Sequence, residues 1–289
     1  MDYFKLMRPK HWVKNFLVFA AMIFSFSFDL LSVSKVVAAF IIMSLCASSI
    51  YIINDIADRN KDRKHPKKRY RPIASGKISV STAVTLCALL FVVVFSAAVW
   101  LNIFFAIALA IYFIINIFYS FGLKNISIID TMIVASGFVI RVVAGAYVIN
   151  VPVSHWLLLC TFFLSLFMAF GKRKNEMDLL DKENSKLHRK AVSEYTDGFV
   201  NQILAITAGI SVVFYTLYTI DSATIERFGT DNLIYTTPIV VFVVLRYFHL
   251  LYNKKEGGDP VGIFTKDIQI IFAVLAWIIS ILVIYYINA

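Results

Sequence analysis

The sequence contains few charged residues, and this limits the class of protein it can encode. Asp, Glu, Lys and Arg make up 16% of its 289 residues, whereas 60% are hydrophobic and the mean hydropathy is +0.77. A soluble domain usually has about 45–50% apolar and about 25% charged residues. The composition therefore excludes an ordinary soluble domain and indicates a membrane protein.

Cysteine and histidine are also scarce. The three cysteines, Cys46, Cys87 and Cys160, lie in separate apolar segments and form no CxxC pair. With this distribution we expect neither a disulfide framework nor a cysteine-based metal site. The five histidines do not pair at metal-ligand spacing. We expect packing roles for the cysteines and incidental or interfacial roles for the histidines.

The apolar residues are arranged in runs with very few charges, of the length that crosses a bilayer, about 17–25 residues. The runs are 15–34, 36–53, 80–99, 101–119, 126–149, 154–170, 200–220, 233–251 and 268–287. They predict an all-α fold, a multi-pass membrane bundle of about nine transmembrane helices in a single domain, 1–289. A count of eight is also possible, because the third and fourth runs are nearly continuous. The first run lacks a small-residue cleavage pattern, so we expect no signal peptide there.

The basic residues lie almost entirely on one side of this predicted bundle. Of the 28 lysines and arginines, all but Lys35, Arg141 and Arg227 precede the first run, lie in the even-numbered gaps or, in the case of Arg246, lie near the end of the run before one. This bias predicts that the amino terminus and the cap loops are cytoplasmic and the carboxyl terminus is outside. The expected location is the plasma membrane. A nucleic-acid-binding surface fits poorly with charge that alternates loop by loop, so we expect no nucleic-acid partner.

Three aspartates follow the second apolar run directly. If the helix continues, Asp55, Asp58 and Asp62 share one face, because they stand at positions i, i+3 and i+7. Carboxylates so placed repel one another unless a cation joins them. Mg²⁺ binds through one or two carboxylates and completes its shell with water and substrate phosphates. The spacing, with Asn54 beside it, predicts a metal site at the membrane border; the alternative is a solvated helix end.

A basic segment follows the aspartates. Arg69, Arg71 and Lys77 lie within a turn-forming Pro/Gly stretch, and guanidinium and ammonium groups bind phosphate oxygens. Together with the aspartates they predict a diphosphate site. The alternative is positive-inside topology with attraction to anionic lipid headgroups.

One pair of charges lies deeper in the predicted membrane segments. Asp130 and Arg141 are 11 residues apart in the fifth run, which puts them on one helix face, roughly 16 Å apart along the axis. A charge inside a membrane helix usually faces a polar cavity or a partner. A site for substrate and a structural ion pair are both consistent with this spacing.

The sixth gap begins with a second group of charges. Lys172, Arg173 and Glu176 stand just after a helix and could complete a site opposite the aspartates. The more distal basic residues of the same gap are better explained as a solvated or lipid-facing surface.

Several motifs together resemble one known family. They are NDxxDxxxD at 54–62, YSxxLK at 119–124, RPKHWVKN at 8–15, RPIASG at 71–76, SGFVIRVVAG at 136–145, GKRKNE at 171–176, LRY at 245–247 and GGDP at 257–260. The chain resembles the UbiA superfamily of intramembrane prenyltransferases, and within it the branch that transfers phosphoribose to decaprenyl phosphate. These segments cover nearly the whole chain in order.

The resemblance implies a UbiA-like fold and a set of substrates. The donor would be 5-phosphoribosyl diphosphate and the acceptor a polyprenyl phosphate, with Mg²⁺ and the diphosphate on the three aspartates. The catalytic residues would be Asp55, Asp58 and Arg141. Asn54, Tyr119, Lys124 and Asp130 would contact substrate, and Lys14, Lys124 or Arg141 would hold the lipid phosphate. Ordinary members carry a second Asp-rich motif where this chain has GKRKNE, with Asp178 and Asp181 forming only a shortened DxxD. That departure favours the phosphoribosyl branch.

Two alternative functions remain open. A prenyltransferase of the same family would use a prenyl diphosphate donor and an aromatic or glycerol-phosphate acceptor. A transporter is remote, because no convincing internal repeat is present and the ionisable groups lie mostly at one border. A homo-oligomer is possible.

Overall fold

The computed structural model describes residues 2–66, 68–180, 190–253, 262–263 and 266–288, and in these residues every regular element is a helix. The chain forms two compact units, Met1–Val153 and Ser154–Ala289. The described residues confirm the all-α prediction, while the prediction of a single domain stays a prediction. The segment GGDP at 257–260 and Asp181 lie outside the described residues.

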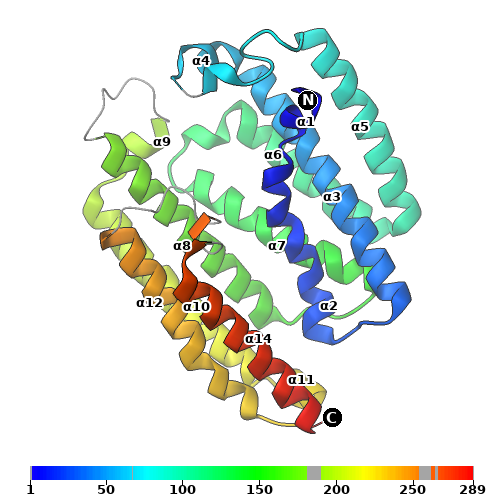
Figure 1. Ribbon diagram of the computed structural model, residues 1–289, viewed down its shortest axis with the longest axis vertical. Coiled ribbons are helices and arrows are strands. Elements are labelled where there is room, and N and C mark those ends of the chain that lie inside the picture. The colour runs from blue at the N-terminus through cyan, green and yellow to red at the C-terminus, as the bar shows by residue number, and fades with distance from the viewer. Residues whose placement is uncertain (1, 67, 181–189, 254–261, 264–265, 289) are drawn as a thin grey trace. The chain divides into compact units, whose positions relative to one another are not determined.

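Unit 1 contains four long helices and several short ones (Figure 1). In chain order they are α1 (Asp2–Met7), η1 (Pro9–Phe19), α2 (Ala20–Ser25), α3 (Leu30–Ala57), α4 (Arg59–Lys64), η2 (Lys68–Tyr70), α5 (Val80–Leu101), α6 (Ile103–Phe121), η3 (Leu123–Asn125) and α7 (Ile129–Ile149). Its core is apolar and lies between η1, α3, α5, α6 and α7, with Met43, Phe105 and Leu109 fully buried.

Unit 2 has the same character. Its helices are α8 (His155–Leu180), α9 (Lys190–Ser193), α10 (Asp197–Thr219), α11 (Ser222–Phe228), η5 (Asn232–Thr236), α12 (Thr237–Asn253) and α14 (Ile268–Asn288). The helices α8 and α10 pack side by side, and so do α12 and α14.

Eight of the described helices are long and apolar enough to cross a membrane. The predicted run 15–34 is not one of them. It is divided among η1, α2, a turn in which Phe26 has φ of 53°, and the beginning of α3, where Asp29 accepts a hydrogen bond from the Ser32 amide at 2.9 Å. The count of nine therefore stays a prediction. The third and fourth runs are separate helices, because Asn102 has extended backbone angles and caps α6 with its side chain.

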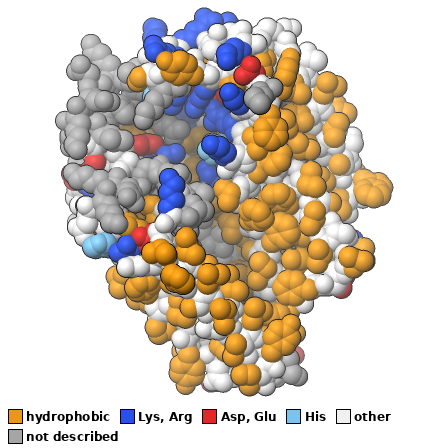
Figure 2. Space-filling view, viewed as in Figure 1, with side chains coloured by type: hydrophobic (Ala, Val, Ile, Leu, Met, Phe, Trp, Pro, Cys, Tyr) orange, Lys and Arg blue, Asp and Glu red, His pale blue; other side chains and the backbone are white. Residues whose placement is uncertain are grey.

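The surface of unit 1 matches the predicted division between a lipid-facing side and a polar border. Figure 2 shows lysine and arginine side chains gathered at the end of the unit that carries α4, and mostly apolar side chains along the long helices beside it. Large hydrophobic side chains such as Leu89, Val92 and Val93 on α5 are exposed. In water such a surface would be an aggregation hazard, but against hydrocarbon it is the expected one.

Candidate active site

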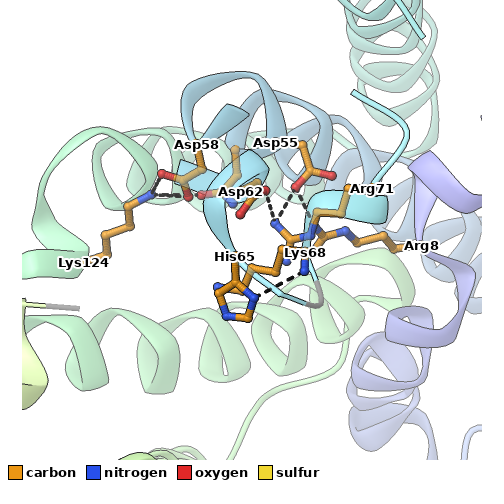
Figure 3. Close-up of polar contacts among 9 residues, drawn as sticks. Arg8, Asp55, Asp58, Asp62, His65, Lys68, Arg71 and Lys124 are labelled. Carbon is orange, nitrogen blue, oxygen red and sulfur yellow. Dashed lines mark hydrogen bonds and ion pairs between the residues drawn. The ribbon is translucent and has the colours of Figure 1, made fainter. Parts of the chain in front are cut away.

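The helix that carries the first aspartate ends earlier than the sequence suggests. The helix α3 stops at Ala57, Asp58 leaves helical geometry with φ of −90° and ψ of 4°, and α4 begins at Arg59. The condition under which the three aspartates would share one face of a continuous helix is therefore not met. Asp55, Asp58 and Asp62, called the carboxylate cluster below, come from α3, the one-residue break and α4 (Figure 3).

Two members of the cluster share a partner. The Arg71 guanidinium donates through Nη1 to Asp55 Oδ1 at 3.0 Å and to Asp62 Oδ2 at 2.6 Å, and thus bridges both carboxylates. Arg8 donates to the same Asp55 oxygen. The side chains of Asp55 and Asp62 are 2% and 5% exposed, so these charges are compensated inside the protein rather than by water.

The middle aspartate has a different partner. Lys124 Nζ, on η3, donates to the two oxygens of Asp58 at 2.9 and 2.7 Å, and to Asn54 Oδ1 at 3.3 Å. The Lys124 side chain is buried. Lys124 therefore lies at the predicted site, as its motif suggested, but in this structure its ammonium group is paired with the Asp58 carboxylate (Figure 3).

Apolar packing fixes the two arginines. Leu6 of α1 and Ile73 of the loop after η2 are buried in one cluster with Ile52 of α3. The loop itself is a tight turn in which Gly76 has φ of 81°, a conformation that favours glycine. Because Leu6 and Ile73 lie two residues from Arg8 and Arg71, the same cluster places both guanidiniums beside Asp55.

Arg8 is the site residue that sequence reasoning did not assign. Its backbone is left-handed, with φ of 52°, and Pro9 follows it. Its guanidinium lies over the Tyr51 ring, 5.1 Å from the centroid. Burial lowers the pKa of Arg8, opposed by the nearby Asp55 carboxylate, but an arginine stays protonated in either case. The available signal was its place in the RPKHWVKN segment.

The cluster contains an oxygen donor suited to a metal. Asp55 Oδ2 is buried and has no hydrogen-bond partner in the structure. No three His, Cys, Asp or Glu side chains lie close enough together to hold a metal ion among the residues that the structure describes. Asp55 and Asp62, however, already converge on one cationic nitrogen. Their oxygen-only donor set fits a hard ion such as Mg²⁺, with the remaining positions left for water and phosphate.

Arg141 is buried but lies in a separate, neutral environment. It donates from Nε to Asn15 Oδ1, from Nη1 to the Gly137 carbonyl and from Nη2 to Tyr112 Oη, each at 2.7 Å. Asn15 in turn donates to Ser44 Oγ at 3.0 Å. No ion pair joins Arg141 to a carboxylate among the described residues. The structural ion pair with Asp130, one reading of the spacing, is not formed.

The remaining predicted residues of unit 1 lie around this centre with varied exposure. Arg69 is exposed and stacks on Tyr70, 4.9 Å from the ring centroid. Lys77 is exposed and lies 3.9 Å from Asp2. Lys14 on η1 and Tyr119 on α6 are half-buried, and Asp130 is fully buried in the first turn of α7. Of the predicted substrate-binding residues, Arg71 and Lys124 donate hydrogen bonds to the carboxylate cluster, and Asn54 accepts one from Lys124.

The predicted residues of unit 2 all lie on α8. Lys172 is exposed, Arg173 is buried, and the Arg173 guanidinium donates to Glu176 one turn further on. Asp178, the described half of the shortened DxxD, pairs with Lys174 at 3.3 Å. That Lys172, Arg173 and Glu176 complete a site with the carboxylate cluster stays a prediction.

An intramembrane helical bundle with an Asp-rich site at its polar border defines a class of membrane transferase. The chain belongs to the UbiA prenyltransferase family, whose sequence profile matches residues 15–260. It is 38% identical to the decaprenyl-phosphate phosphoribosyltransferase of Mycolicibacterium smegmatis over 95% of this chain and 89% of that one. It is 34% identical to the enzyme of the same name from Corynebacterium glutamicum, over 98% and 86% of the two chains.

Solved structures confirm the fold. A UbiA homologue from Archaeoglobus fulgidus, bound to GPP and Mg²⁺, superposes with a TM-score of 0.74 at 20% identity, over 99% of this chain and all of that one. A digeranylgeranylglyceryl phosphate synthase superposes with a TM-score of 0.66 at 22% identity, over 97% of each chain. Both the family membership and the UbiA fold predicted from the motifs are confirmed.

Proposed function

We propose that this protein transfers 5-phosphoribose from phosphoribosyl diphosphate to a polyprenyl phosphate in a Mg²⁺-dependent reaction. The observation that carries the proposal is the similarity along nearly the whole chain to relatives named for decaprenyl-phosphate phosphoribosyl transfer. The product would be a phosphoribosylated lipid carrier for cell-wall or surface glycans. We further propose a plasma-membrane location with the cluster cytoplasmic and the carboxyl terminus outside.

The carboxylate cluster and its cations suit a leaving diphosphate. Asp55 and Asp62, and Asp58 with them, would hold Mg²⁺, which supplies charge neutralisation for the diphosphate when bound. Arg8, Arg71 and Lys124 are placed to donate to phosphate oxygens, as charge-assisted hydrogen bonds require. Arg69 and Lys77, exposed on the adjoining loop, can assist at its edge.

The reaction needs no strong general base. The bond between the anomeric carbon and the diphosphate oxygen breaks as that carbon gains oxocarbenium character, and a lipid phosphate oxygen forms the new bond. A phosphate monoester has a second pKa of about 6, so the lipid phosphate acceptor is mostly dianionic at neutral pH. Lys14 at the border of unit 1 is proposed to hold it, with Tyr119 and Asp130 lining the approach.

A labelled-donor assay tests this function. Membranes containing the protein are incubated with polyprenyl phosphate, labelled phosphoribosyl diphosphate and Mg²⁺, and the organic phase is counted. We expect a labelled lipid that requires all three components. If no labelled lipid forms, the phosphoribosyl assignment is wrong.

A prenyl diphosphate donor is the second candidate. It is favoured by the homologue of the same fold that is bound to GPP and Mg²⁺. The same membranes, given labelled prenyl diphosphate and an aromatic or glycerol-phosphate acceptor, distinguish the two donors.

A further inference from the structure

The carboxylate cluster is matched one to one by cations. Arg8 pairs with Asp55, Arg71 pairs with Asp62 and also with Asp55, and Lys124 pairs with Asp58. Each of these ion pairs links residues from different elements (Figure 3). The formal charge of the six side chains is zero. A site balanced in this way has little net attraction for a free cation or for a free anion, because each newcomer is repelled by groups of its own sign.

Arg71 occupies the place where a metal bound by two carboxylates would lie. Its Nη1 is 3.0 Å from Asp55 Oδ1 and 2.6 Å from Asp62 Oδ2, so one cationic nitrogen already joins the two groups. A metal that binds these same two oxygens would replace this nitrogen. Asp55 Oδ2, buried and without a hydrogen-bond partner in the structure, is a second oxygen donor on the same carboxylate.

The two guanidiniums can move without unfolding their surroundings. The chain around them is held by Leu6 and Ile73, which are fully buried, whereas the side chains of Arg8 and Arg71 are 18% and 26% exposed. Rotation of the long side chains suffices, and each guanidinium has five N–H donors for phosphate oxygens. Lys124 is more enclosed and is held by Asn54 as well as Asp58, so we expect it to move less.

We propose that Mg²⁺ and diphosphate bind to this protein as a coupled pair, because the metal releases Arg71 and Arg8 from the carboxylates and the released guanidiniums then bind the diphosphate. Arg8 and Arg71 thus serve as counter-ions of the carboxylates before substrate binds and of the phosphates afterwards. This coupling rests on the proposed function in one respect: the proposed function places a metal and a diphosphate at the carboxylate cluster.

The sharpest test measures metal binding alone. Full-length protein in detergent is titrated with Mn²⁺, a paramagnetic substitute for Mg²⁺, and free Mn²⁺ is measured by electron paramagnetic resonance. We expect Arg71→Gln to bind Mn²⁺ about tenfold more tightly than the wild type, and Arg8→Gln to show a smaller gain in the same direction. In the Arg71→Gln background, Asp55→Asn should abolish the binding, which locates the ion in the cluster.

Arg63→Gln is the matched control. Arg63 is exposed on α4, close in sequence to Asp62, but its Nε donates to the Ala74 carbonyl at 3.1 Å and not to a carboxylate. The Arg63→Gln substitution removes the same charge as Arg71→Gln but frees no metal ligand, so the Mn²⁺ affinity should change less than about twofold. If Arg63→Gln tightens Mn²⁺ binding as much as Arg71→Gln does, the effect is one of general charge and the proposal is overturned.

A second titration uses the preformed complex of Mn²⁺ with inorganic diphosphate. The wild type should bind this complex about tenfold more tightly than Arg71→Gln does, which reverses the order found for the bare metal. An Arg71→Gln variant with unchanged or weaker affinity for bare Mn²⁺, or with unchanged affinity for the complex, would overturn the coupling. Neither probe contains ribose or lipid, so a failed transfer assay contradicts the proposed function without affecting this result.

Discussion

The carboxylate cluster and Arg141 are two ways in which unit 1 accommodates buried charge. In the cluster, acids and bases compensate one another, two cations compete for one Asp55 oxygen, and the other oxygen has no partner. Arg141 meets only neutral acceptors, and Asn15, Tyr112 and the Gly137 carbonyl satisfy its donors in three directions. The first arrangement can exchange partners when a ligand arrives, whereas the second loses hydrogen bonds if any partner moves.

This difference changes the role expected for Arg141. The sequence predicts for Arg141 a catalytic role or the binding of the lipid phosphate, with a structural ion pair as the alternative. The geometry instead favours a structural role, in which Arg141 connects α7 to η1 and α6 through hydrogen bonds. The Tyr112 ring, whose centroid lies 4.7 Å from the guanidinium carbon, adds a cation–π contact. The catalytic assignment of Arg141 stays a prediction, and the following experiments separate the two roles.

The largest effect is expected at Asp55. We expect Asp55→Asn to lower the transfer rate by about a thousandfold, because an amide is a poor ligand for a hard cation and leaves the developing diphosphate charge unbalanced. Labelled-lipid formation measures the loss. Asp29→Asn, which changes an exposed helix cap, is the matched control and should keep near-normal activity. An active, folded Asp55→Asn protein would contradict the metal assignment.

The next largest effect concerns stability. Arg141→Met should destabilise the protein by about 2–4 kcal/mol, because buried Asn15 and Tyr112 each lose a partner. Thermal melts in detergent should show the drop, while the Mn²⁺ affinity of the carboxylate cluster stays the same. A variant that melts normally but has a strongly raised KM for the lipid would show that Arg141 contacts substrate.

A smaller loss is expected where η1 approaches α7. A Cβ at Gly145 would lie 1.9 Å from the Val18 carbonyl oxygen, so Gly145→Ala must push η1, and Asn15 with it, away from Arg141. Overpacking of this kind costs about 1–3 kcal/mol, and we expect a lower melting temperature. Gly209→Ala is the matched control, since a Cβ there meets nothing within 4 Å. An equal drop in both variants would contradict the close packing.

The smallest effect is expected in unit 2, at the ion pair between Arg246 and Asp267. Arg246 donates to the two Asp267 oxygens at 3.2 and 2.8 Å, and these hydrogen bonds hold the pKa of Asp267 below its usual range. A carboxyl group whose pKa is lowered by folding stabilises the folded state at pH values above its unfolded-state pKa, which is about 3.9. That contribution is lost as the pH falls through the lower, folded-state value.

Asp267→Asn therefore tests the pair by its pH dependence. Its melting temperature should fall below that of the wild type at neutral pH, by an amount equivalent to about 1 kcal/mol or less. The difference should shrink in acid, once the wild-type carboxyl group is itself protonated. A difference that is constant across the titration would mean that the charge of Asp267 contributes nothing.

Comparison of the prediction with the structure shows how far local sequence patterns extend. Hydropathy places most of the long helices to within a few residues, because a membrane helix satisfies its own backbone and needs only length and apolar composition. The exceptions are α3, which begins six residues before its run, and α8, which ends ten residues after its run. The first run, 15–34, is apolar in composition, but η1, α2 and the Phe26 turn divide it, so its crossing of the membrane stays a prediction. Composition carries no information about such turns.

The sequence by itself determined the class, the family and the identity of the acidic residues, since these depend on composition and on motifs read along the chain. Only the tertiary structure decided which cation each acid meets. Arg8, Arg71 and Lys124 come from positions 47, 16 and 66 residues away from their aspartates. Spacing along one helix cannot encode these pairings, because they arise when α1, the loop after η2 and η3 pack around the end of α3.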